Sequence, residues 1–258
     1  MIAQINAAQN ISVHLETELL ETQGYKGSLT SVLRTGGGEV TVQHGATIVA
    51  TGAREYRGTE YGYGSHPHIL TQQEFEVRLG DSLVGASHGQ KTGTSVVMIQ
   101  CVGPAEQYCS RTCCTVALKN ALKLKTLNPS AQITVLYRDI RTYGFKERLY
   151  TEARRAGVLF IRYDADHKPE VRSPDRDGEQ HRSAGEPLEV RVWEPMLGRE
   201  IVLRPDTLVL STPLVPAEGA EDLANRLKVG VDLDGWLMEA HVKPVSYTHL
   251  TLPTTPYV

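Results

Sequence analysis

The sequence predicts an α/β fold in which parallel strands alternate with helices. Three consecutive segments carry this prediction: an apolar strand at residues 95–100, an amphipathic helix at 115–125 and a second apolar strand at 132–137. Short apolar runs are typical of buried parallel strands, whereas apolar residues that recur every three to four positions indicate a helix. The three segments form a βαβ unit, whose ligand is expected beyond the carboxyl end of the first strand.

The amino-terminal part of the chain is predicted to consist of strands. They are expected at residues 11–17, 27–34 and 39–43, with a glycine turn at 36–38. A further apolar run at residues 46–53 is too short for a helix and ends at a glycine. We therefore predict that it is a buried parallel strand that opens onto a turn.

The carboxyl-terminal part continues the alternation. A helix is expected at residues 146–156, a polar loop at 165–186, and strands at 158–163, 188–193, 201–204 and 206–212. The last of these strands is apolar and runs into a turn, as residues 46–53 do. Two such strands suggest two related domains.

The composition limits the classes of function. The chain has 258 residues, of which 40% are hydrophobic and 22% charged, with a net charge of −3. No broad basic surface follows from this balance, so nucleic acid is not an expected partner. We expect no direct membrane insertion and a cytoplasmic location, because no apolar run reaches a membrane span and the first six residues lack the regions of a secretory signal.

The four cysteines all lie within one stretch of fourteen residues. They are Cys101, Cys109, Cys113 and Cys114. Four thiolates are what a [4Fe–4S] cluster requires, and we take this as the first hypothesis. Zinc also binds four cysteines, but usually through two Cys-x-x-Cys pairs, which this sequence lacks. Buried thiols and a redox disulfide are further alternatives, although the adjacent pair could close only a strained ring.

The cysteines occupy the position of a phosphate-binding loop. Cys101 follows the first strand of the βαβ unit, where a dinucleotide fold would have Gly-x-Gly-x-x-Gly, and only Gly103 of that pattern is present. Cys109 and Cys113 are four residues apart, so we expect them on one face of the first helical turn. The helix amino terminus and Arg111 would favour the thiolate forms.

Two further groups are weaker candidates. His66 and His68 could bind a metal, although paired loop histidines more often have no such role. Arg138, Asp139 and Arg141 follow the second strand of the βαβ unit, where a dinucleotide fold binds a ribose. A surface ion pair is the alternative for these three residues.

Four segments together resemble a known family. They are Cys101-Val-Gly, Tyr108-Cys-Ser-Arg-Thr-Cys-Cys, Tyr137-Arg-Asp-Ile-Arg-Thr-Tyr-Gly and Ala50-Thr-Gly-Ala-Arg-Glu-Tyr. Over residues 1–244 the chain resembles the flavin and iron–sulfur subunit of heterodisulfide reductase and its bacterial relatives, which include quinone-interacting membrane-bound oxidoreductases. The resemblance implies a thioredoxin-reductase-like tandem Rossmann-type FAD/NAD(P)-binding fold, in which the first domain holds FAD.

The resemblance also implies cofactors, partners and site residues. The four cysteines would ligate a [4Fe–4S] cluster, and Thr51, Gly52 and Ala53 would contact FAD, unless this turn only ends a core strand. The resemblance further implies that Arg138, Asp139 and Arg141 line the region between the flavin and the cluster. The chain would be an electron-transfer subunit that passes electrons between FAD and the cluster to other redox subunits of a heterodisulfide-reductase-like complex. The alternative is a structural metal domain, stabilised by zinc or a cluster.

The family pattern also predicts that the fold is truncated at both ends. Its Gly-x-Gly-x-x-Gly loop and its later Gly-Asp motif are both missing, so we expect an incomplete FAD site. Residues 245–258 read like a translated sequencing adaptor and are interpreted as a non-native tail. The implied domains are 1–53, the carboxyl-terminal part of the first FAD segment; 54–94, a linker; 95–212, the second Rossmann-like domain with the iron–sulfur site; and 213–244, the returning FAD segment.

Overall fold

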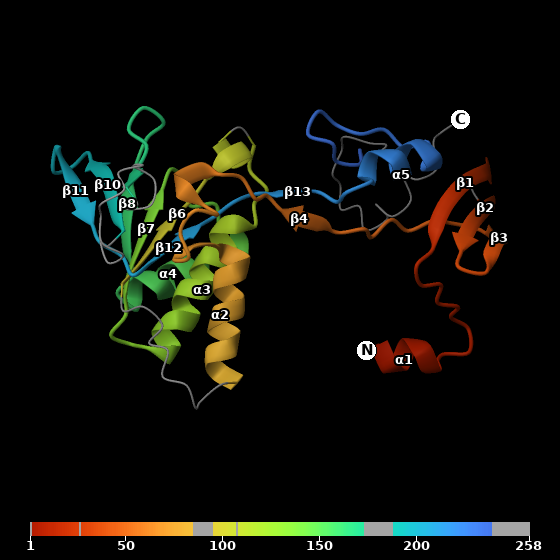
Figure 1. The fold of residues 1–258 in the computed structure, drawn as a ribbon, viewed down its shortest axis with the longest axis horizontal. Coiled ribbons are helices and arrows are strands. Elements are labelled where there is room, and N and C mark those ends of the chain that lie inside the picture. Colours follow the sequence, from red (N-terminus) through yellow and green to blue (C-terminus); the bar gives the residue numbers. More distant parts are fainter. Residues whose placement is uncertain (1, 26, 85–94, 107, 173–187, 239–258) are drawn as a thin grey trace. The chain divides into compact units, whose positions relative to one another are not determined.

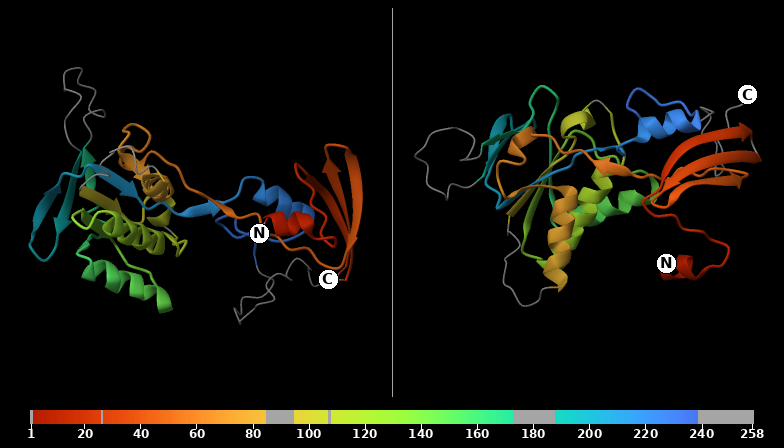
Figure 2. Two further views of the ribbon diagram at one scale, coloured as in Figure 1. Left: turned by 90° about the horizontal axis from the view of Figure 1, so that it is seen from below. Right: turned by 45° about the vertical axis from the view of Figure 1, so that its right-hand side comes forward.

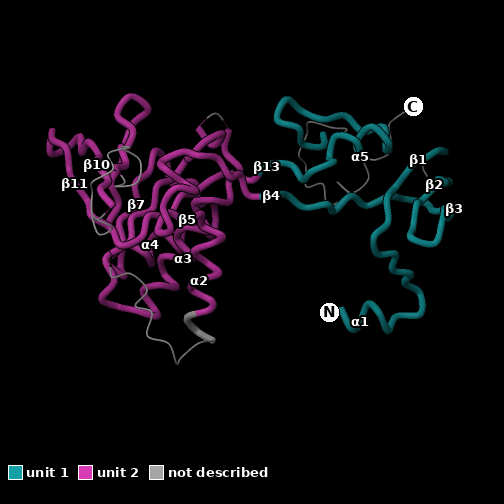
Figure 3. The backbone as a smooth tube through the Cα atoms, viewed as in Figure 1, with its two compact units in different colours: residues 1–54, 215–258 teal, residues 55–214 magenta. Residues whose placement is uncertain are grey.

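The chain divides into two compact units. The first contains residues 1–54 and 215–258, and the second contains residues 55–214 (Figure 3). The computed structural model describes residues 2–25, 27–84, 95–106, 108–172 and 188–238, so the tail at 245–258 lies outside the described residues. The boundary between the units falls within the short strands β4 (Ala53–Glu55) and β13 (Leu214–Pro216).

The first unit contains an antiparallel sheet in the order β1-β2-β3. Its helices and strands are α1 (Ile2–Ala7), β1 (Glu18–Tyr25), β2 (Ser28–Thr35), β3 (Gly38–His44) and α5 (Ala220–Leu227). The predicted hairpin is thus confirmed, since Thr35 pairs with Gly38 across the glycine turn. The predicted strand at residues 11–17 is wrong. Its apolar residues Ile11, Val13 and Leu15 are all exposed, and no described strand hydrogen-bonds to them.

The predicted buried strand at residues 46–53 is also wrong. This segment is irregular, only Ala53 at its end belongs to a strand, and Ile48 is 70% exposed. A parallel strand needs neighbours that satisfy its backbone groups, and residues 46–52 pair with no described strand. The argument for two related domains, which compared this segment with residues 206–212, therefore fails.

A pair of polar contacts joins α5 to β1 within the first unit. Arg226, in the last turn of α5, donates to the carboxylate of Glu18 at 2.6 Å and also to the carbonyl oxygen of Leu19. Ala224 and Leu227 on the same helix are buried. Residues 220–227 are therefore structurally continuous with the amino-terminal sheet, although about 200 residues separate them in sequence.

The second unit is built on a sheet of five parallel strands. Their spatial order is β5 (Ile69–Thr71), β12 (Thr207–Leu210), β6 (Ser95–Ile99), β7 (Gln132–Tyr137) and β8 (Leu159–Arg162). Figure 1 labels the last four of these strands. Helix α3 (Cys113–Leu127) connects β6 to β7, and α4 (Glu147–Arg155) connects β7 to β8. The predicted α/β fold class and its βαβ unit are confirmed.

The two faces of this sheet pack against different layers. On β6, Val96 and Met98 join the core formed with the helices, whereas Val97 and Ile99 join the core on the other face. That second face is covered by an antiparallel sheet of β9 (Glu170–Arg172), β10 (Glu189–Glu194) and β11 (Arg199–Leu203) (Figure 2). Strand β9 falls inside the predicted polar loop at 165–186, of which residues 173–186 lie outside the described residues.

Residues 54–94, assigned above to a linker, contain β5 and helix α2 (Gln72–Val84). A capping box starts this helix. The Glu74 amide donates to the Thr71 hydroxyl at 3.3 Å, and the Thr71 amide donates to the Glu74 carboxylate at 3.0 Å. Phe75 and Leu79 then bury the helix against the sheet core. This helix was missed from the sequence, although its Thr-x-x-Glu signal was present there.

Three short turns of 3-10 helix complete the second unit. They are η1 (Glu60–Gly62), η2 (Gly103–Glu106) and η3 (Gly144–Lys146). Among the described residues, no helix combines the length and the apolar character needed to cross a membrane.

Candidate metal centre

All four cysteines line one cavity. Cys101 directly follows β6, Cys109 lies in the loop before α3, and Cys113 and Cys114 are the first two residues of α3. The cavity has a volume of about 90 Å³, equivalent to about three water molecules. The other lining residues are Ala105, Glu106, Tyr108, Arg138, Asp139 and Arg141. Segments that are 40 residues apart in sequence thus meet at one edge of the sheet.

The cysteine loop starts at the point where the strand order reverses. From β6 the chain continues through β7 to β8 on one side, while β12 pairs with β6 on the other. The Ser211 amide donates to the Ile99 carbonyl at 2.8 Å, and the Val102 amide donates to the Ser211 carbonyl at 3.3 Å. Open α/β sheets bind ligands in the crevice at this position.

Cys101 has a left-handed backbone conformation, with φ of 60°. This conformation costs a residue other than glycine about 1–2 kcal/mol, so the surrounding structure must hold it in place. The preceding residue provides this restraint: the Gln100 amide donates to the Leu136 carbonyl at 2.9 Å, and its carbonyl accepts from the Tyr163 hydroxyl at 2.6 Å. Both Gln100 and Tyr163 are buried.

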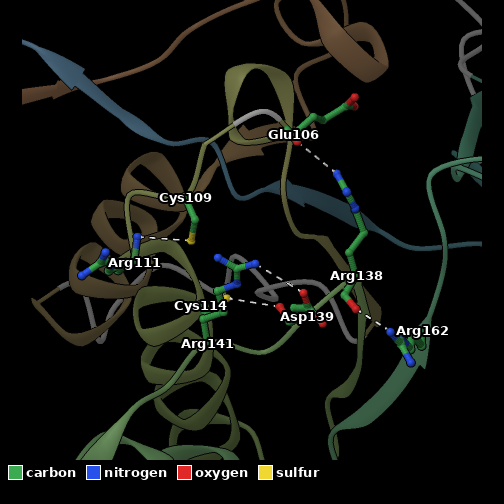
Figure 4. A network of polar contacts seen from close by, with 8 residues as sticks. All are labelled: Glu106, Cys109, Arg111, Cys114, Arg138, Asp139, Arg141 and Arg162. Carbon is green, nitrogen blue, oxygen red and sulfur yellow. Dashed lines mark hydrogen bonds and ion pairs between the residues drawn. The ribbon is translucent and has the colours of Figure 1, made fainter. Parts of the chain in front are cut away.

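Cys109 lies outside the helix, so the prediction that it shares a helical turn with Cys113 is wrong. Thr112 is the N-cap of α3, and Arg111 before it has a φ of 60°, which breaks any helical path back to Cys109. The Arg111 amide donates to the Cys109 sulfur at 3.4 Å. The Arg111 side chain is exposed and extends away from Cys114 (Figure 4). Its backbone, rather than its guanidinium, therefore contacts a thiol.

The two thiols on the helix are both buried. Cys114 donates to Cys113, which lowers the pKa of Cys113 and raises the pKa of Cys114. Cys114 can also donate to the Asp139 carbonyl, which lies 3.7 Å away, and the Ser110 hydroxyl lies 3.7 Å from the Cys113 sulfur. Burial raises the pKa of Cys101. Cys113 is therefore the thiol of the three that ionises most readily.

Two arginines approach the cavity from the loop after β7. Arg138 donates to the Glu106 carbonyl at 3.4 Å, and Arg141 pairs with the Asp139 carboxylate at 3.5 Å (Figure 4). The electrostatic effect of the nearby Cys109 sulfur is the largest cause of the raised pKa of Arg141. The structure places the three candidates from the loop after β7 together at the cysteine cavity: Arg138, Asp139 and Arg141. Asp139 and Arg141 also form an exposed ion pair, which was the alternative interpretation.

A tyrosine-rich segment that was given no role from the sequence contacts the cysteine loop. The Tyr56 hydroxyl donates to Glu60 at 2.9 Å, and a β-carbon on Gly103 would lie 2.6 Å from the Tyr56 ring. Burial, followed by the charge of Glu106, raises the pKa of Tyr61 to about 12. The sequence held one sign of this close packing: Gly103 is the only glycine of the Gly-x-Gly-x-x-Gly pattern present in the cysteine loop.

Four cysteine thiols are a donor set that both zinc and an iron–sulfur cluster can bind. All four thiols are free of disulfides. Four thiolates on one zinc ion, at about 2.3 Å each, would bring the sulfurs within about 4 Å of one another. Within the described part of the chain, no three His, Cys, Asp or Glu side chains form a group that could hold a metal ion, His66 and His68 included. In a cubane cluster each cysteine binds a different iron, so wider spacing is tolerated.

The predicted flavin contacts lie in the first unit, whereas the cysteines lie in the second. Thr51, Gly52 and Ala53 are all exposed, and no atom lies within 4 Å of the position of a β-carbon on Gly52. Gly52 has a φ of 71°, which favours glycine. These residues do not end a core strand, so that alternative is wrong, and their contact with FAD stays a prediction.

The fold and the site define a dinucleotide-binding type of α/β domain with a four-thiol loop at its switch point. No family model matches the sequence. The chain is 34% identical over 221 residues to an H(2):CoB-CoM heterodisulfide,ferredoxin reductase subunit of Methanothermobacter marburgensis, and the match covers 80% of this chain and 32% of that protein. It is 32% identical over 222 residues to a CoB--CoM heterodisulfide reductase iron-sulfur subunit of Methanocaldococcus jannaschii, with the same two coverages.

The chain is therefore a relative of these heterodisulfide reductase subunits, as its motifs indicated, and it spans about a third of their length. Among solved structures it is similar to thioredoxin reductase of T. acidophilum, with a TM-score of 0.44 and 13% identity over 86% of this chain and 59% of that one. An ornithine N-hydroxylase of Kutzneria matches with a TM-score of 0.46 and 14% identity, over 91% and 62%.

Proposed function

We propose that this chain is part of a subunit of an electron-transfer oxidoreductase and that its four cysteines bind a [4Fe–4S] cluster. The single observation that carries the proposal is the shared cavity, in which Cys101, Cys109, Cys113 and Cys114 converge from a strand end, a loop and a helix start. The name of the M. jannaschii relative, an iron–sulfur subunit of a reductase, supports the same chemistry.

Each part of the site would contribute to holding an anionic cluster. A bound cluster would accept and donate single electrons, while FAD would exchange electrons in pairs. The amino terminus of α3 favours negative charge at Cys113 and Cys114. The Arg111 amide, already directed at the Cys109 sulfur, would donate to a ligating thiolate.

For FAD, we propose that Thr51, Gly52 and Ala53 form one part of a larger site. The exposed turn and the open space at Gly52 leave the backbone accessible to a ligand. Because the family's phosphate loop is missing, the 258-residue chain should bind FAD weakly or not at all. A stoichiometric yellow flavin that stays with the purified chain through gel filtration would contradict this.

The partners we propose are other redox subunits of a heterodisulfide-reductase-like complex. The relatives are themselves named as reductase subunits, and the name of the Methanothermobacter marburgensis relative includes ferredoxin. The proposed exchange is electron transfer between the cluster of this chain and carriers held by neighbouring subunits, with no role for nucleic acid.

The test is analysis of iron and acid-labile sulfide in the chain after anaerobic reconstitution, together with the electron paramagnetic resonance spectrum after reduction. We expect the content of one cubane cluster per chain. Cys109→Ser and Cys113→Ser should each lose most of the iron, whereas the double variant His66→Ala/His68→Ala should keep it. Stoichiometric zinc without iron would overturn the proposal and favour a structural metal domain.

A further inference from the structure

Arg138 and Arg141 are held at the cysteine cavity by contacts that are independent of any ligand. Arg138 donates to the Glu106 carbonyl at 3.4 Å, while its own carbonyl accepts from the Arg162 side chain at 3.2 Å. Arg141 is held by the Asp139 carboxylate at 3.5 Å. Figure 4 shows the Arg141 guanidinium beside Cys114 and the Arg138 side chain extended toward Glu106. Each arginine thus has a protein partner, a backbone carbonyl for Arg138 and an exposed carboxylate for Arg141.

The positive charges of these two arginines are only partly balanced. The Glu106 carboxylate pairs with Lys168 and not with Arg138, to which Glu106 presents only its carbonyl. No described carboxylate forms an ion pair with Arg138. Asp139 faces Arg141 across a long contact in which both side chains are about half exposed. The two lining arginines are thus matched in number by the carboxylates of Glu106 and Asp139, but the Arg138 charge has no described carboxylate partner of its own.

We propose that Arg138 and Arg141 raise the reduction potential of the cluster bound at this cavity. The inference rests on the proposed cluster and adds the residues that set its redox behaviour. Reduction adds one electron to the cluster and one negative charge to the cavity, with no bond formed or broken. Fixed cations beside a partly buried site stabilise that added charge more than they stabilise the oxidised form.

The experiment measures midpoint potentials in the full 258-residue chain, reconstituted anaerobically with ferrous iron and sulfide. The cluster is titrated with dithionite, which supplies the electron, and the reduced form is followed by electron paramagnetic resonance. The variants are Arg141→Gln, which removes the charge, and Arg141→Lys, which keeps it. The matched control is Arg155→Gln, because Arg155 is an exposed residue of α4 that does not line the cysteine cavity.

We expect Arg141→Gln to keep the iron and sulfide of the parent and to have a more negative midpoint potential. Arg141→Lys should lie between that variant and the parent, and Arg155→Gln should match the parent. Arg138→Gln should shift the potential in the same direction as Arg141→Gln.

Each remaining outcome also decides the question. A full cluster with an unchanged potential in both glutamine variants would overturn the inference and leave the proposed cluster intact. If Arg141→Gln loses its iron but Arg141→Lys retains it, the decision passes to Arg138→Gln: a more negative potential supports the inference and an unchanged potential overturns it. Loss of iron in both Arg141 variants would assign the residue a structural role and overturn the inference. A parent chain without iron would instead overturn the proposed function.

Discussion

The Tyr163 hydroxyl donates to the Gln100 carbonyl at 2.6 Å, one residue before Cys101. Tyr163 directly follows β8 and Gln100 directly follows β6, so this contact crosses the intervening strand β7. Both residues are buried, and the contact fixes the peptide that leads into the left-handed turn at Cys101. Tyr163 thereby positions a cysteine to which it makes no hydrogen bond of its own.

Tyr163→Phe should lower the free energy of unfolding. The ring would still fill its place in the core, but the buried Gln100 carbonyl would lose the hydroxyl that donates to it, at a cost of about 1–3 kcal/mol. Urea denaturation followed by circular dichroism would measure the change. Tyr143→Phe is the control, because Tyr143 is 64% exposed, and it should change the free energy by less than about 0.5 kcal/mol. Equal stabilities of the two variants would refute the role given to this hydrogen bond.

Gly103→Ala should also destabilise the second unit. Gly103 has a φ of 63°, and the added β-carbon would lie 2.6 Å from the Tyr56 ring, so Tyr56 or the loop must move. We expect a loss of more than about 1 kcal/mol in the free energy of unfolding. Gly80→Ala is the matched control. Gly80 is exposed within α2, its β-carbon would meet no atom within 4 Å, and the variant should gain about 0.5–1 kcal/mol. A stable Gly103→Ala chain would show that the close approach is unimportant.

Glu55→Gln should change how stability depends on pH. Burial raises the pKa of Glu55 above its usual 4.5, so the folded state holds the proton more tightly than the unfolded state does. The stability from this group is therefore fully present below about pH 4.5 and is lost as the pH rises through the higher folded value. Glutamine keeps an oxygen that can accept from the Gln73 amide, now 3.2 Å away, and does not ionise.

We expect Glu55→Gln and the parent to be most alike near about pH 4, with the variant becoming relatively more stable towards about pH 7. Thermal denaturation at several pH values would measure this difference. Glu152→Gln, at an exposed position of α4, is the control for the loss of a charge. The explanation fails if the advantage of the Glu55 variant is the same at every pH.

Arg226→Gln should loosen α5 from β1 in the first unit. The arginine contacts both the Glu18 carboxylate and the Leu19 carbonyl, and no other hydrogen bond among the described residues links these two elements. Hydrogen exchange should become faster in residues 18–25 and 220–227 and stay unchanged in the five-stranded sheet. Arg34→Gln, which removes an exposed contact to the same Glu18, is the control and should leave the exchange of α5 unchanged. Unchanged exchange in both segments of Arg226→Gln would mean that apolar packing alone holds the helix.

Local sequence signals predicted the βαβ core well. The strands at 95–100 and 132–137 and the helix between them are apolar enough that burial decides their structure, and each appears within two residues of the expected bounds. Residues 46–53 have a similar composition, but residues 46–52 pair with no described strand. Apolar runs alone do not distinguish a strand inside a sheet from an extended segment without neighbours, because pairing depends on residues far away in sequence.

The site was predictable in its residue types but not in its geometry. The spacing of Cys109 and Cys113 suggested a shared helical face, and the left-handed Arg111 between them makes this impossible. Such a conformation in an arginine is imposed by the surrounding structure rather than by local preference. Likewise, Tyr163 and Gln100 meet only because parallel strands end at the same edge of the sheet.

The position of the cysteines on either side of the β6–α3 connection has a consequence for folding. A group bound to both Cys101 and Cys113 would close this connection as a covalent crosslink closes a loop. Such a closure reduces the conformational freedom of the unfolded chain. Its binding free energy would then become folding free energy. Assembly of the cofactor and completion of the crossover would be a single coupled event, so the cofactor supply would control how much of the second unit reaches its native state.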